Sequence, residues 1–174
     1  MTCESGEEGG SYSDAQRWPP SVLRAPDASE IVPALDAAVV ASRGVPAAAC
    51  PGVVFLIDEC VTPLLRLVAA VFGYRAQFVY DLGWGTLKDW ELRPKIIERN
   101  FTLITNNRDD WRAIVADEEL HPGLVVLIEN APRAKEVHYF TRVLLAIAAL
   151  PDLVNTVVEV DRDGTVTRHL LSKE

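Results

Sequence analysis

Two carboxylates follow the first strongly apolar run of the chain. Residues 53–57, Val-Val-Phe-Leu-Ile, lead directly into Asp58 and Glu59. A short and partly β-branched run of this kind, placed after Pro51-Gly52, is typical of a strand buried on both faces of a parallel sheet. Because open α/β sheets bind their ligands at the carboxyl ends of the strands, these two acids are candidate functional residues.

More polar residues follow the next two expected strands. Asp81 and Asp89 come after residues 77–80, and a polar group comes at the end of residues 101–105: Thr105, Asn107, Asp109 and Asp110. If the strands are parallel, all three junctions meet at one edge of the sheet. Oxygen donors without His or Cys favour Mg²⁺ or Mn²⁺ over zinc. Such an ion suits water activation and phosphodiester cleavage.

Structural roles account for some of these acids equally well. Asp89 and Asp110 each precede an expected helix, where a carboxylate commonly caps the free N–H groups of the first turn. Glu59 also fits a solvated residue after a strand. Asp58 has the strongest claim to function, because it ends the strand expected at the centre of the sheet.

The elements that must position these residues alternate along the chain. We predict strands at residues 53–57, 77–80, 101–105 and 124–128, and helices at 28–42, from Thr62-Pro63, from Asp89 to about 100, from Asp110, and at 135–150. Thr62 is the expected N-cap of the second helix. Residues 154–160 and 165–171 flank Asp161-Arg162-Asp163-Gly164, which indicates a hairpin. The fold class is therefore α/β, a three-layer sandwich with a mainly parallel central sheet and a C-terminal β-hairpin.

The composition divides the chain into four parts. Residues 1–26 are rich in Gly, Ser, Glu and Pro and predict a disordered tail. Residues 27–52 predict a helical leader and linker, residues 53–150 the α/β domain, and residues 151–174 the attached hairpin. No GxGxxG or P-loop motif is present, which argues against dinucleotide and Walker-type nucleotide binding.

The net charge and the cysteine content indicate which partners and which cellular compartment to expect. The formal net charge is −8, so a broad basic surface for nucleic acid is not expected, although a metal ion can bring phosphate to an acidic edge. Three cysteines, Cys3, Cys50 and Cys60, fit neither a zinc site nor a disulfide framework. Without an apolar leader or membrane segment, we expect a cytoplasmic protein that does not enter membranes.

The ordered series of motifs resembles the PIN-like nucleases, especially a compact branch found as toxins of toxin–antitoxin pairs. The resemblance spans about residues 53–129, and its motifs are individually short. It rests on the following residues: Phe55-Leu56-Ile57-Asp58-Glu59 with Pro63-Leu64 behind it, Gly73-Tyr74, Asp81-Leu82-Gly83 with Asp89, and Leu103-Ile104-Thr105-Asn106-Asn107 with Asp110-Trp111.

The resemblance implies RNA cleavage that depends on Mg²⁺ or Mn²⁺. Asp58, Asp89 and Asp110 are the implied catalytic and metal-binding acids, with Glu59, Asn107 and Asp109 in supporting positions. This sequence departs from the family at two places: Asn107 stands where many members have an acid, and Trp111 replaces the usual Phe. The first change removes one negative charge from the site.

Two other functions remain open from the sequence. Asn107 replaces an acid of the family, which weakens the site. The protein would then be a catalytically weak PIN-like protein that binds RNA or a partner. A response-regulator receiver also begins with an acidic pair, but it requires an aspartate after the third strand and a lysine after the last.

The expected partners are RNA, an antitoxin protein and a second copy of the chain. A second copy is expected because the apolar helices offer more surface than one small domain covers.

Overall fold

Strands and helices alternate along the chain, as the sequence predicts. The computed structural model describes residues 28–46 and 52–171, so the predicted tail lies outside the described residues. Its elements are α2 (Ala28–Ala41), β1 (Val54–Ile57), α3 (Leu65–Val71), β2 (Arg75–Phe78), the 3-10 turn η2 (Val79–Leu82), α4 (Asp89–Glu98), β3 (Phe101–Thr105), α5 (Arg108–Ala116), β4 (Leu124–Val126), α6 (Arg133–Ile147), β5 (Thr156–Val160) and β6 (Val166–Leu170).

Six strands form one sheet in the order β2-β1-β3-β4-β5-β6. The first five strands are mutually parallel, and β6 pairs antiparallel with β5 at the edge. β1 lies between β2 and β3, and its residues Phe55, Leu56 and Ile57 have no exposed surface. The prediction of a buried central strand is therefore confirmed.

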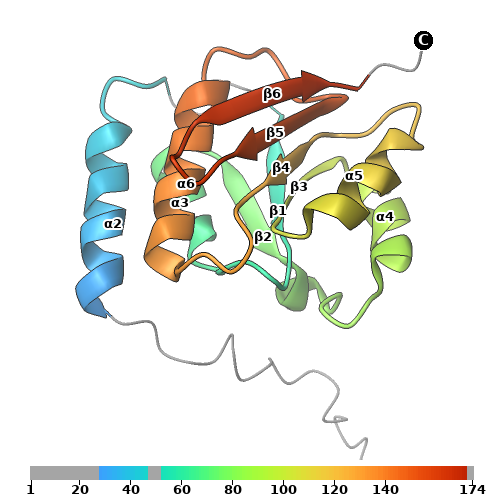
Figure 1. Ribbon diagram of the computed structural model, residues 1–174, viewed down its shortest axis with the longest axis horizontal. Helices are drawn as coiled ribbons and strands as arrows, with labels where there is room; N and C mark the ends of the chain where they lie inside the picture. The colour runs from blue at the N-terminus through green and yellow to red at the C-terminus, as the bar shows by residue number, and fades with distance from the viewer. Residues whose placement is uncertain (1–27, 47–51, 172–174) are drawn as a thin grey trace, which may run out of the picture.

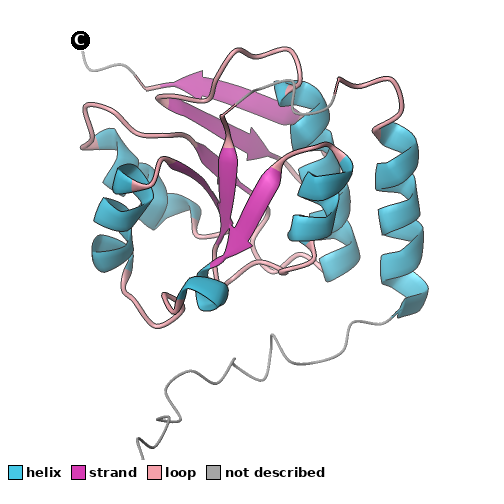
Figure 2. Ribbon diagram, turned by 180° about the vertical axis from the view of Figure 1, so that it is seen from behind, coloured by secondary structure: helices cyan, strands magenta, loops and turns pink. Residues whose placement is uncertain are grey.

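Helices cover both faces of the sheet. α3 and α6 lie on one face, with α2 packed outside them, and α4 and α5 lie on the other (Figure 1). The view from behind in Figure 2 shows the same three layers. The predicted three-layer α/β sandwich with a C-terminal antiparallel hairpin is thus the observed fold.

Several predicted boundaries are wrong. Residues 79 and 80 belong to η2 rather than to β2, which begins two residues earlier than predicted. Thr62 does not cap α3: Leu64 occupies the cap position, and the Thr62 hydroxyl accepts the Leu64 backbone N–H at 3.5 Å before the helix begins at Leu65. α5 likewise begins at Arg108 rather than at Asp110.

The strand order creates one natural crevice. The chain moves from β1 outward to β2 and then crosses back to β3 on the other side of β1. The connections after β1 and β3 therefore leave the sheet in opposite directions, and their carboxyl ends frame the place where open α/β sheets bind ligands. None of the helices in the described part of the chain is long and apolar enough to span a bilayer.

Candidate metal centre and cleft

Asp58 stands at the base of this crevice, directly after β1. Its side chain is 7% exposed, and three groups fix its carboxylate. The Thr105 hydroxyl donates to Oδ2 at 2.7 Å, the Cys60 thiol donates to the same oxygen at 3.2 Å, and the Glu59 backbone N–H donates to Oδ1 at 2.8 Å. A buried carboxylate held by three donors is rigid and well placed to act as a ligand.

Asn107 joins the two sides of the crevice. Its backbone N–H donates to the hydroxyl of Thr105 at 3.0 Å, which links it to the group that holds Asp58. Its side-chain Nδ2 donates to Asp110 at 2.9 Å and to Asp89 at 3.3 Å. One amide nitrogen thus stands between two carboxylates, where its partial positive charge offsets their repulsion.

Asp89 is the first residue of α4, but it does not cap the helix. Lys88 occupies the cap position, and Glu91 accepts a hydrogen bond from its backbone N–H at 2.9 Å. The structural explanation of Asp89 as a plain N-cap is therefore wrong. Burial raises the pKa of Asp89, and the negative charges of Asp58, Asp110 and Glu59 raise it further.

Asp110 lies in the first turn of α5 and does not cap its helix either. The cap position is Asn107, which makes no capping hydrogen bond through its side chain. The carboxylate of Asp110 is instead turned toward the amide of Asn107. Asp89 is held by Asn107 from a distant part of the chain, whereas Asp110 is held by the same amide three residues before it.

Glu59 is exposed at the mouth of the crevice, where Tyr80 orients it. The phenol donates to Oε2 at 2.9 Å. Burial raises the pKa of Tyr80 to about 12, with the hydrogen bond to Glu59 adding to the effect, so the phenol stays protonated and remains a donor. A Cβ at Gly85 would lie 2.4 Å from the ring of Tyr80, so only glycine lets the loop before α4 pass so close.

Cys60 completes the loop after β1. Its sulfur lies 3.4 Å from the Thr105 hydroxyl and accepts the Asn106 backbone N–H at 3.5 Å. Although Cys60 as a residue is exposed, the burial of its thiol, followed by the charge of Asp58, raises the pKa of that thiol to about 12. The thiol is therefore protonated at neutral pH and acts as a donor to Asp58 rather than as a thiolate nucleophile.

The donors at this edge suit a hard cation. Carboxylates converge from the end of β1 and from the first turns of α4 and α5, and the charges of the others raise the pKa of Asp89. Within residues 28–46 and 52–171, no three His, Cys, Asp or Glu side chains yet stand close enough together to hold an ion. The chemistry of the residues fits Mg²⁺ or Mn²⁺, whereas their spacing requires the side chains to close in.

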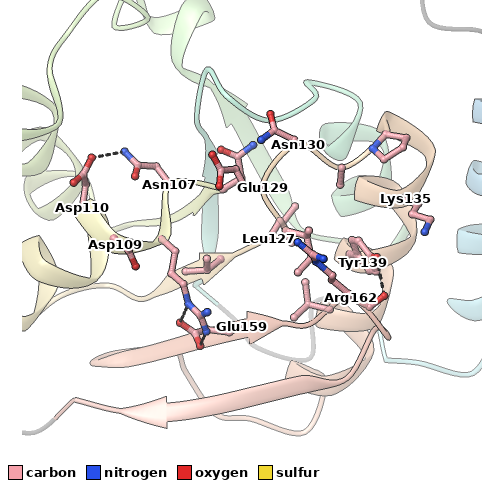
Figure 3. Close-up of a pocket in the computed structure, with 17 residues that line it drawn as sticks. Asn107, Asp109, Asp110, Leu127, Glu129, Asn130, Lys135, Tyr139, Glu159 and Arg162 are labelled. Atoms are coloured by element: carbon pink, nitrogen blue, oxygen red, sulfur yellow. Dashed lines mark hydrogen bonds and ion pairs between the residues drawn. The ribbon is translucent and has the colours of Figure 1, made fainter.

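A cleft of about 1000 Å³ opens beside the acids. It lies over the carboxyl ends of β3, β4 and β5 and reaches the first turns of α5 and α6. Figure 3 shows Asn107 and Asp110 on one side and Lys135, Tyr139 and Arg162 on the other. Three cations line the cleft, Arg108, Lys135 and Arg162, together with four acids, Asp109, Asp110, Glu129 and Glu159.

Arg108 is anchored in the wall of this cleft by Glu159. Glu159 is 6% exposed, and its carboxylate accepts two hydrogen bonds from the Arg108 guanidinium, at 3.2 and 2.5 Å. Arg112 and His169 also face it, at 3.3 and 3.5 Å. Burial raises the pKa of Glu159, but these cationic partners outweigh it and hold the pKa below its ordinary value.

Two predicted acids do not join the cluster. Asp81 is exposed in η2 and forms an ion pair with Arg66 of α3. Asp109 is exposed and lines the cleft without a hydrogen bond to the other acids among the described residues. Asp58, Asp89, Asp110 and Asn107 are the members linked by shared hydrogen-bonding partners or by charge.

Sequence reasoning missed the residues that support the acids from a distance. Tyr80 and Arg108 carry no local signal, because their partners become neighbours only in the folded sheet. Glu136 did carry one. It shares a helical stripe with Phe140 and Val143, and an acid on an apolar stripe marks a buried carboxyl.

Comparisons with known proteins give one informative match. The uncharacterized protein y4eN of Sinorhizobium fredii (strain NBRC 101917 / NGR234) is 39% identical over 83 residues, covering 42% of this chain and 81% of that protein. No protein-family model matches the chain, and no solved structure matches it. On the extent of this match, the chain belongs to the same family as y4eN.

Proposed function

We propose that this protein is a metal-dependent ribonuclease of the PIN-like type. The observation that carries the proposal is the clustering of Asp58, Asp89 and Asp110 around Asn107 and Thr105, at the crevice between β1 and β3. The charges of Asp58, Asp110 and Glu59 also raise the pKa of Asp89 there. Such a group is characteristic of sites with perturbed pKa values that serve chemistry.

Each residue of the site has a distinct task in this proposal. Asp58, Asp89 and Asp110 would hold the ion, which when bound supplies an acidic water and a clamp for the scissile phosphate. Thr105 fixes the orientation of Asp58, and Tyr80 does the same for Glu59. Lys135 and Arg162 would contact the flanking phosphates of the RNA, whereas Arg108 is paired with Glu159.

Cleavage of labelled single-stranded RNA, with and without Mn²⁺ or Mg²⁺, tests the proposal. The Asp58→Asn variant keeps the shape of the side chain and removes its charge. We expect it to lower cleavage by about a hundredfold or more, since even residues outside the ligand set of a metal centre cost roughly 10–100-fold. Asp109→Asn is the matched control, because Asp109 lies outside the hydrogen-bonded group, and it should retain most activity.

The proposal fails if purified protein with Mn²⁺ cuts no RNA, or if Asp58→Asn cuts as fast as the unsubstituted chain. Circular dichroism of both variants separates loss of chemistry from loss of fold. Contaminating nuclease would give activity that the Asp58 substitution leaves unchanged.

A non-catalytic PIN-like protein is the second candidate. It is favoured by Asn107, whose amide already donates hydrogen bonds to Asp89 and Asp110, and by the wide spacing of the acids. Such a protein would bind RNA or a protein partner without cutting. RNA binding that persists in EDTA, together with absence of cleavage in Mn²⁺, would identify it.

A receiver-like signalling domain shares the strand order 2-1-3-4-5. Its chemistry, however, requires an aspartate at the end of β3 and a lysine after β5. Thr105 and Asp161 stand in these positions. A small phosphodonor should therefore leave this protein unmodified, and an aspartyl phosphate detected near the end of β3 by mass spectrometry would favour the receiver.

A toxin role, with an antitoxin as partner, belongs to the same proposal. It is supported by the resemblance of the acidic motifs to the compact PIN-like branch. A short neighbouring gene that encodes a DNA-binding-like protein, and that relieves growth arrest caused by this chain, is the expected result. Growth without arrest on induction would argue for a ribonuclease of another kind.

A further inference from the structure

Trp90 is the most exposed aromatic side chain near the acids. It follows Asp89 in the first turn of α4 and is 70% exposed. The other tryptophans in the described part of the chain, Trp84 and Trp111, are buried at 9% and 2% exposure. A large indole left in water beside a functional edge favours recognition of a ligand.

Trp90 forms one wall of its own cavity. The cavity has a volume of about 480 Å³, and Glu59, Lys88 and Asp89 also line it. Asp110 and Asn107 line the larger cleft on the other side of the acids. Because Asn107 contacts Asp89, the acidic site lies between the two hollows.

The surroundings of the ring indicate the class of ligand. The half-buried Leu87 also lines this cavity, and Trp90 is its one exposed large apolar side chain among the described residues, so its apolar surface is smaller than a protein interface would provide. The adjacent carboxylates would repel phosphate at the ring itself. A neutral, flat and polar group such as a nucleobase fits these conditions, with Lys88 available for a neighbouring phosphate.

We propose that Trp90 is a stacking platform for one unpaired nucleobase of a single-stranded RNA, adjacent to the acidic site. This inference rests on the proposed ribonuclease function and specifies its substrate. The strand runs from Trp90 across the acids into the cleft with Arg108, Lys135 and Arg162. Duplex RNA is a poorer ligand, because its bases are already stacked and paired.

Binding of a fluorescently labelled single-stranded RNA of about 12 nucleotides, within the usual range of such sites, tests the inference. Anisotropy is measured in EDTA, so that no metal-dependent cleavage occurs. Trp90→Ala should weaken binding about 5- to 150-fold, the equivalent of 1–3 kcal/mol per stacked base. Trp90→Phe keeps an aromatic face and should lose far less. Leu120→Ala removes an equally exposed apolar side chain outside both hollows and should bind like the unsubstituted chain.

Cleavage in Mn²⁺ provides the second measurement. Trp90→Ala should raise KM by a similar factor, with a smaller change in kcat. If RNA is cleaved and Trp90→Ala matches the unsubstituted chain in both assays, the inference is overturned and the ribonuclease stands. If RNA binds through Trp90 but is never cleaved, the stacking site stands and the ribonuclease falls.

A protein partner would give a different pattern. Trp90→Ala would then change the sedimentation of the protein, alone or with that partner, and leave RNA affinity unchanged, which overturns the inference. Equal loss of affinity for single-stranded and duplex RNA of the same sequence also overturns it, because a stacking platform requires unpaired bases.

Discussion

At the scale of single residues, the partial positive charge on the side-chain N–H group of Asn107 reduces the repulsion between two carboxylates. It donates from one nitrogen to both Asp89 and Asp110, and it is tied through its backbone to Thr105. An amide can reverse this role, because turning the side chain presents its oxygen instead. Asn107 can therefore stabilise the acids without metal and offer them a fourth oxygen when a cation is bound.

Asn107→Asp tests this role directly. A carboxylate in place of the amide adds repulsion between Asp89 and Asp110, so the metal-free protein should melt at a lower temperature than the unsubstituted chain. Mn²⁺ should raise the melting temperature of the variant more, because binding to the folded state stabilises it in proportion to affinity. Thermal unfolding with increasing Mn²⁺ measures both effects.

Asn130→Asp is the matched control for this change. Asn130 is exposed, lines the cleft, and has positive φ, which Asp tolerates nearly as well as Asn. It adds the same charge away from the two acids, so its response to Mn²⁺ should equal that of the unsubstituted chain. Equal responses in both variants would contradict the role of Asn107.

At the scale of elements, α6 holds the loop after β1 in place. Glu136 of α6 is 4% exposed, and its carboxylate accepts the backbone N–H of Thr62 at 2.9 Å. This single contact joins the helix to the segment that carries Asp58, Glu59 and Cys60. Burying a charged carboxylate that has one backbone donor costs free energy. The charged form of this carboxyl therefore lowers the stability of the folded protein, even though its hydrogen bond holds the loop.

Glu136 makes the stability of the protein depend on pH. Burial raises its pKa to about 7 from an ordinary 4.5, despite the backbone hydrogen bond from Thr62 and the charge of Arg133. The folded state then holds a proton that the unfolded chain has released, so stability falls as pH rises from about 4.5 to about 7 and levels off above that.

Glu136→Gln keeps an acceptor oxygen without the charge. It should be more stable than the unsubstituted chain above pH 7, by roughly 1–3 kcal/mol, and equal to it near pH 4.

Urea unfolding at several pH values measures the difference between the two proteins. Glu98→Gln, an exposed change of the same type on α4, should run parallel to the unsubstituted chain at every pH. A constant difference between Glu136→Gln and the unsubstituted chain across this range would show that Glu136 does not titrate as described.

The order and type of the elements follow from local pattern, and so do both ends of β3 and the start of α4, whereas the starts of α3 and α5 do not. The buried β1 run, the amphipathic stripe of α6 and the turn at Gly164 are all readable from the sequence. α3 begins three residues after Thr62, whose backbone N–H is bound by Glu136 from a distant part of the chain, and α5 begins two residues before Asp110. The acids at the sheet edge were predictable because parallel strands end together, but Tyr80 and Arg108 reach the site only through folding.

At the scale of the whole molecule, the sheet needs helices that lie outside the acidic motifs. α2 packs against α6 and α3 as an outer layer, although the sequence presents it as a leader before the domain (Figure 1). Its residues Ile31 and Ala38 are buried, at 6% and 0% exposure. The face of α6 beneath it is therefore covered by the first described part of the chain.

This packing predicts that α2 contributes to global stability. Ile31→Ala should lower the free energy of unfolding by about 2–3 kcal/mol, in the lower part of the range for deleting a buried aliphatic side chain. Val32→Ala lies one residue along the same helix but is 52% exposed, and it should change stability by no more than about 0.5 kcal/mol. Urea unfolding of the full chain compares the two variants.

Removing residues 1–46 should destabilise the protein much more than removing residues 1–26, because only the longer deletion uncovers α6. If Ile31→Ala behaves like Val32→Ala, and both deletions unfold at the same urea concentration, α2 is an appendage and the stable domain begins with β1.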